Sequence, residues 1–209
     1  FYVRPFSVDG SIAKYLTRLN EGLDLERSYD PTKIIPWTNK TGSFYAVPYV
    51  GGVQGVYYNE ELLKSYGLSV PRTWGQFMEA VNKISAQDPD MIPIANALNQ
   101  TEDSEMFMSI AANFLGGPDG RESLMREDGT SLCYNDQKVV SAFQTIEDLK
   151  PFLPRDAATI NSQNSKELFF KGQAVMLFGG SWDLQTVSEN ADFAWGVFAV
   201  PSPTFQTYV

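Results

Sequence analysis

The stretch Phe169–Trp182, FFKGQAVMLFGGSW, combines a helix end, a buried strand and a tight turn. Gly172 ends the helical segment, and Ala174–Phe178 is an uninterrupted apolar run. Such a run is typical of a central strand that is covered on both faces, as in parallel sheets. Gly179–Ser181 then predicts a turn, because glycine and serine favour turn conformations. A short helix is expected to follow over 182–187.

Strand and helix patterns alternate through the rest of the chain. Strands are expected at 1–3, 44–47, 56–58, 91–95, 174–178 and 193–200. Helices are expected at 12–19, 60–66, 73–84, 105–115, 136–149, 165–170 and 182–187. This order predicts an α/β fold in which helices cover both faces of a sheet.

Local signals refine some of these helices. Asn59 and Thr73 each stand where a side-chain oxygen can cap the following helix. On the helix expected at 136–149, helical spacing predicts that Val140, Phe143 and Leu149 face the core.

The composition excludes several classes of function. Lys and Arg number 16 and Asp and Glu 25, so the formal charge is -9 and nucleic-acid binding is not expected. The absence of histidine removes Ser-His-Asp and Cys-His catalysis and imidazole metal sites. Cys133 is alone, so an internal disulfide and a thiolate metal cluster are also excluded, and we expect a buried structural thiol. No metal or cofactor is predicted.

The hydropathy of the chain and its first residues bear on where the protein is located. No stretch approaches the roughly 20 apolar residues of a membrane span. The chain opens with the strand-like residues 1–3 and not with a signal peptide, so we expect a domain whose front has been removed.

Three stretches, taken in order, carry a family resemblance. The first is Phe44–Tyr49 followed by Val56–Leu63, the second is Tyr66–Phe77, with Pro-Arg-Thr-Trp inside it, and the third is Phe169–Trp182. Together they resemble family 1 of the extracellular solute-binding proteins, the maltose- and oligosaccharide-binding group.

This resemblance implies an α/β fold of the periplasmic-binding-protein-like type II, with two lobes and a ligand cleft. It predicts a partial N-terminal lobe at 1–55, most of the C-terminal lobe at 56–198, and the start of a return crossing at 199–209. Relative to the family, we expect this sequence to lack a strand-helix-strand unit in front and a helical segment behind. The implied function is that of a non-enzymatic carrier, located outside the cytoplasm, in the periplasm or lipid-anchored on the outer face of the membrane. Such a carrier is expected to hand a sugar or oligosaccharide to an ABC permease.

A sugar is held by an aromatic stacking surface and by planar polar groups. Trp182 is the leading stacking candidate, because it follows a strand end, where open α/β folds place ligands. Asp183 either accepts hydroxyls of the ligand or favours the helix dipole. Tyr49 and Gln54 flank the Gly51-Gly52 turn and are expected to line the cleft.

Further candidates lie at other strand ends. Asp9 resembles a cleft-lining carboxylate, although a helix cap explains it equally well. Asn96, Asn99 and Gln100 follow the strand expected at 91–95, where amides can read sugar hydroxyls. The remaining tryptophans are expected in the core; these are Trp37, Trp74 and Trp195.

Two other functions compete with the carrier. The first is a glycoside hydrolase, which needs two carboxylates at a set distance, and Asp9 and Asp183 could supply such a pair. The second is a ligand-binding sensor domain with the same fold and no role in transport.

Overall fold

The computed structural model describes residues 13–20, 22–30, 34, 37–38, 42–49, 51–116 and 136–203. The strand predicted at 1–3, Asp9 and Cys133 lie outside these residues. The chain divides into two compact units, Phe1–Gly51 with Leu115–Asp136, and Gly52–Phe114 with Gln137–Val209. The assignment of 1–55, 56–198 and 199–209 to lobes stays a prediction.

The second unit is built on a four-stranded sheet. Its strands are β1 (Gln54–Asn59), β2 (Ile92–Ile94), β3 (Ala174–Gly180) and β4 (Trp195–Phe198), in the order β2-β3-β1-β4. All of β3 is buried, as its apolar sequence predicts for a central strand. The sheet is mixed, however, because β2 pairs with β3 in parallel whereas β1 pairs antiparallel with both β3 and β4.

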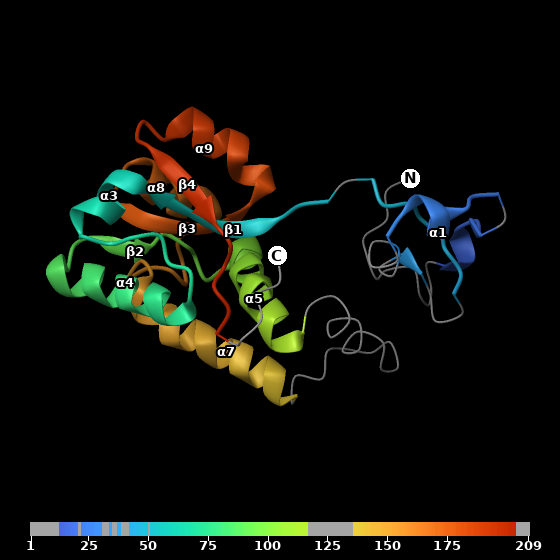
Figure 1. Cartoon of the computed structure of the whole chain (residues 1–209), viewed down its shortest axis with the longest axis horizontal. Coiled ribbons are helices and arrows are strands. Elements are labelled where there is room, and N and C mark those ends of the chain that lie inside the picture. The colour runs from blue at the N-terminus through green and yellow to red at the C-terminus, as the bar shows by residue number, and fades with distance from the viewer. Residues whose placement is uncertain are drawn as a thin grey trace. The chain divides into compact units, whose positions relative to one another are not determined.

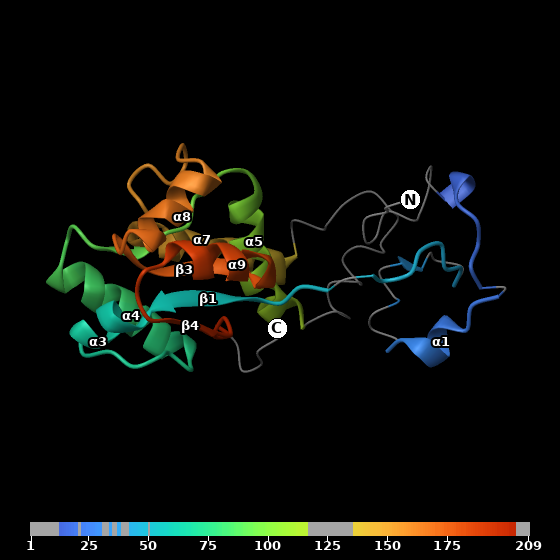
Figure 2. The same cartoon turned by 90° about the horizontal axis from the view of Figure 1, so that it is seen from above.

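Helices cover both faces of this sheet, as predicted. One face packs against α4 (Trp74–Gln87), α5 (Gln100–Leu115) and α7 (Gln137–Leu149), and the other against α8 (Ser162–Phe170) and α9 (Leu184–Asn190). Figure 1 shows α4 and α7 on one side of β3 and α9 on the other, and Figure 2 gives the view from above. Three shorter elements complete the described part of the unit: α3 (Glu60–Ser65) and two 3₁₀ turns, at Lys150–Phe152 and Ser181–Asp183.

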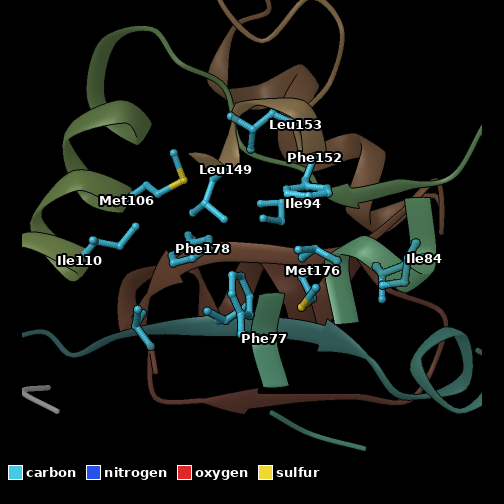
Figure 3. Packing of buried hydrophobic residues seen from close by; sticks show 14 of the residues in the cluster. Phe77, Ile84, Ile94, Met106, Ile110, Leu149, Phe152, Leu153, Met176 and Phe178 are labelled. Carbon is cyan, nitrogen blue, oxygen red and sulfur yellow. The ribbon is translucent and has the colours of Figure 1, made fainter. Parts of the chain in front are cut away.

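The larger core lies between the sheet and α4, α5 and α7 (Figure 3). At its centre the ring of Phe77 meets that of Phe178 edge to face, with centroids 6.0 Å apart. Met106 and Ile110, which are one helical turn apart on α5, are fully buried. Complete burial of side chains of this size stabilises a fold by about 1.5–3 kcal/mol each.

The predicted caps are confirmed. The side-chain oxygen of Asn59 accepts hydrogen bonds from the backbone NH groups of Glu61 and Leu62, each at 3.0 Å. The Thr73 hydroxyl accepts one from Gln76 at 3.2 Å. Each cap satisfies NH groups that have no partner inside the helix.

The predictions for α7 and α8 are only partly right, since Leu149 is buried as predicted but other positions differ. On α7, Val140 and Phe143 are exposed, and the buried side chains are Val139, Ala142, Thr145 and Leu149. The exposed ring of Phe143 instead stacks on Phe107 of α5, with centroids 4.5 Å apart. Helix α8 begins at Ser162 and not at Ser165, because Asn161 caps it by accepting a hydrogen bond from Asn164.

The described part of the first unit has little regular structure. A 3₁₀ turn at Ala13–Tyr15 replaces the helix predicted at 12–19, and α1 spans Leu25–Ser28. Phe44 forms an isolated bridge with Thr38 in place of the strand predicted at 44–47. The backbone groups of Phe44 are used elsewhere, since its NH donates to the side chain of Asn20 and its carbonyl accepts from Leu19, both at 2.8 Å.

Candidate sugar-binding site

Trp182 lies at the end of the sheet where the central strand β1 begins and the central strand β3 ends. It belongs to a 3₁₀ turn, Ser181–Asp183, that directly follows β3. Its side chain is 51% exposed, so it is not a core tryptophan. In contrast, Trp74 and Trp195 are partly buried and pack against the two cores, as predicted.

Two glycines allow the indole to lie against backbone. A β carbon on Gly52 would come within 2.6 Å of Cζ3 of Trp182, and one on Gly180 would collide with the same ring. Both positions therefore require glycine for this placement of the ring. The ring thus lies on a floor of backbone atoms, and about half of Trp182 remains accessible to solvent.

Ser181 ties the Trp182 turn to the start of β1. Its backbone NH donates to the carbonyl of Val53 at 2.8 Å, and its hydroxyl accepts from the NH of Val53 at 3.3 Å. These two bonds hold Gly52 and Val53 beside the turn. Gln54, the first residue of β1, is in register with Gly180.

A polar network lies beneath the same turn. Asp183 is buried; one carboxylate oxygen pairs with the Lys166 ammonium at 2.7 Å, and the other accepts from the NH of Gly180 at 3.0 Å. The Tyr57 hydroxyl donates to the carbonyl of Gly180 at 2.7 Å. Burial raises the pKa of Tyr57 to about 12, and the charge of Asp183 adds to this shift.

A groove of about 260 Å³ adjoins the turn. Most of its lining is apolar, and it shares Gly180 and Ser181 with the Trp182 segment. Its lining residues are Val53, Gln54, Gly55, Tyr57, Gly180, Ser181, Leu184, Val197, Phe198 and Ala199. A concave, mostly apolar surface with a few polar groups is the usual form of a small-molecule site. Among the described residues, no group of acidic or cysteine side chains is placed to hold a metal ion.

The three amide candidates, Asn96, Asn99 and Gln100, differ in their surroundings. Asn96 is fully buried and exchanges two hydrogen bonds with the backbone of Phe178, at 2.7 and 2.9 Å, so it extends the pairing of β2 with β3. Asn99 donates to the carbonyl of Ile160 at 2.6 Å, while its own buried carbonyl oxygen has no partner. Gln100 begins α5, and its side chain lies outside the described residues.

The structure does not test the remaining candidates at this site, and they stay predictions. Tyr49 is 93% exposed and belongs to the first unit, and Asp9 lies outside the described residues. Within the described residues of the second unit, the site brings together three of the predicted residues, Trp182, Asp183 and Gln54.

Lys166 and Tyr57 belong to this site but were not predicted from the sequence. Lys166 lies within an ordinary amphipathic helix, and nothing in the sequence signals its pairing with Asp183. For Tyr57, the alternation of side chains along a strand could have placed it on the face opposite Val56.

Comparison with known proteins defines the class. Residues 12–208 match the family described as bacterial extracellular solute-binding protein, and the chain belongs to this family. The multiple sugar-binding protein of Streptococcus mutans serotype c is 25% identical over 174 residues, which cover 75% of this chain and 38% of that protein.

Solved structures share the fold. A chitin oligosaccharide binding protein is 25% identical, with a TM-score of 0.70, over 91% of this chain and 49% of its own. A family 1 extracellular solute-binding protein from Bifidobacterium longum subsp. infantis is 22% identical, with a TM-score of 0.75, over 96% of this chain and 52% of its own. The predicted α/β solute-binding fold is thereby confirmed, and the chain spans about half the length of these two structures.

The relatives are named as binding proteins, and the family is extracellular by its description. Within the described residues, no helix combines the length and the apolar character that crossing a membrane requires.

Proposed function

We propose that this chain contributes to the binding of a sugar or oligosaccharide that an ABC permease imports, and that Trp182 is the stacking surface for one sugar ring. The observation that carries the proposal is the half-exposed indole, seated on Gly52 and Gly180 at the carboxyl end of β3. Membership of the solute-binding family and the names of the relatives, which include sugar and chitin oligosaccharide binders, support it.

The physics of sugar recognition fits this arrangement. One face of a sugar ring presents C–H groups, which lose unfavourable hydration when they cover an aromatic ring. The ring of Trp182 rests on backbone, so it offers a flat surface without a flexible side chain behind it. Gln54 and Ser181 supply amide and hydroxyl groups at the adjoining groove for hydrogen bonds to sugar hydroxyls.

Catalysis by paired carboxylates has no support at this site. Asp183 is buried, and both of its oxygens are engaged, one by Lys166 and the other by Gly180. A carboxylate in that setting is not available as a nucleophile or as a proton donor to a glycosidic oxygen.

The location proposed for the protein is outside the cytoplasm, in the periplasm or lipid-anchored on the outer face of the membrane. A carrier that works with a permease must meet its ligand on that side. Membership of the extracellular solute-binding family supports this location.

Isothermal titration of the gene product that contains this chain, against neutral mono- and oligosaccharides, tests the function. We expect saturable binding of at least one sugar, weakened by Trp182→Ala, with the sugar recovered intact. No heat with any sugar, or release of hydrolysis products, would contradict the proposal.

A further inference from the structure

The turn that carries Trp182 is held in place by hydrogen bonds to its backbone that do not involve the indole. The NH of Gly180 donates to Asp183, the carbonyl of Gly180 accepts from Tyr57, and the NH of Ser181 donates to Val53. Three backbone polar groups where β3 passes into this turn are therefore satisfied by Tyr57 of β1, by Val53 just before β1 and by Asp183 itself.

Asp183 is in turn held from a third element. The Lys166 ammonium, on α8, lies 2.7 Å from its carboxylate, and the two side chains are only 15% and 7% exposed. Ion pairs in such partly dry surroundings are far less screened than pairs on the surface. Helix α8 thus fixes the carboxylate, and the carboxylate fixes the turn.

The indole itself lies against backbone. Gly52 and Gly180 offer no side chains to pack against it, and about half of it faces solvent. Its orientation therefore depends on where the backbone of Gly52 and Gly180 is held.

We propose that Asp183, Lys166 and Tyr57 are positioning residues for Trp182, and that Asp183 does not itself bind the sugar. The effect on sugar affinity rests on the function proposed above, whereas the effect on the indole does not. Both oxygens of Asp183 are already used inside the protein, which leaves the role of reading hydroxyls to groups at the groove.

The test follows the indole directly, without ligand. The chain has four tryptophans, so labelling the gene product with 5-fluorotryptophan gives each of them a ¹⁹F resonance, and Trp182→Phe assigns the one of interest. In Asp183→Asn an amide nitrogen can face the Lys166 ammonium, and Tyr57→Phe removes one hydrogen bond. We expect both variants to shift or broaden the Trp182 resonance.

A matched control separates positioning from general destabilisation. Thr73→Ala removes the cap of α4, which is not part of the network, and lowers the stability without disturbing the turn. We expect the Trp182 resonance to stay in place in this variant. A Trp182 resonance that is unchanged in both network variants, or that moves as much in Thr73→Ala, would overturn the proposal.

Sugar affinity provides the second readout. Asp183→Asn should weaken binding about tenfold, as expected when the support of a binding group is lost. If the resonance moves while the parent protein binds no sugar, the positioning role stands and the function fails. If sugar binds equally to parent and variants and the resonance is unmoved, the function stands and the positioning role fails.

Discussion

Trp182 and Phe143 are equally exposed aromatic side chains of the second unit, at 51% and 50%, yet their surroundings differ. Phe143 lies on α7 and stacks on the ring of Phe107. Trp182 lies on the backbone of two glycines at a strand end, beside a groove and above a buried ion pair.

The difference shows that exposure alone does not mark a binding site. In the Phe143–Phe107 pair each ring is stacked on the other, so the contact is ordinary packing between two helices. The Trp182 turn combines a rigid floor, an open ring and satisfied polar groups, which are the features of a preorganised surface.

The largest effect is expected when the support of Trp182 is broken. Lys166→Met leaves Asp183 buried without a counter-ion and should destabilise the protein by about 3 kcal/mol. Lys171→Met, at the residue that follows the same helix, is the matched control, since the Lys171–Glu167 pair is also 2.7 Å long but exposed, and such pairs contribute about 0–1 kcal/mol. Urea unfolding followed by circular dichroism measures both, and equal losses would contradict the account.

Removal of the indole itself should have the next largest effect. Trp182→Ala should weaken sugar binding about thirtyfold, or about 2 kcal/mol, as for a central aromatic anchor. Phe143→Ala, with the same exposure, should leave affinity unchanged. Titration calorimetry of the two variants decides between them, and a similar loss in both would remove the distinction between the two aromatics.

A smaller effect is expected at the floor of the ring. Gly52→Ala places a methyl group against the indole and should displace it, which costs affinity about fivefold, or about 1 kcal/mol. Gly75→Ala in α4 meets no atom within 4 Å and should stabilise the helix slightly. Affinity and melting temperature of both variants test this pair, and unchanged affinity in Gly52→Ala would show that the indole does not need its floor.

The smallest effect concerns pH. Because the pKa of Tyr57 is raised to about 12 from 10.0, mainly by burial, the folded protein holds the phenolic proton more tightly than the unfolded chain. This stabilisation is complete below pH 10 and is lost as the pH rises towards 12. The stability of Tyr57→Phe should therefore fall less steeply over that range than the stability of the parent.

Tyr15→Phe removes an exposed hydroxyl and serves as the control for this measurement. Urea titrations at intervals from pH 9 to about 12 give the slopes. Identical slopes for the parent and Tyr57→Phe would contradict the burial of an un-ionised phenol.

Much of the second unit could be predicted from local signals. The apolar run of β3 and the caps at Asn59 and Thr73 depend on neighbours in the sequence, and all are confirmed. The buried face of α7 was predicted only in part, because Phe143 stacks on Phe107 of α5, a contact that only the tertiary structure reveals.

The site was predictable only in part. The position of Trp182 after a strand and a glycine turn marked it as a candidate, because strand ends in α/β folds gather ligand-binding groups. The role of Asp183 depends on Lys166, which approaches from another helix, and no local pattern encodes that distance. For the same reason the strand predicted at 44–47 failed, since the side chain of Asn20 takes the NH group of Phe44.

The most direct measurement of the central claim is a sugar titration of the 5-fluorotryptophan-labelled gene product, followed by ¹⁹F NMR. A ring that stacks on the indole changes its magnetic surroundings, so the Trp182 resonance should move in proportion to saturation and more than those of Trp74 and Trp195. If sugar binds with the Trp182 resonance unchanged, the indole is not the stacking surface, and the proposed site is wrong.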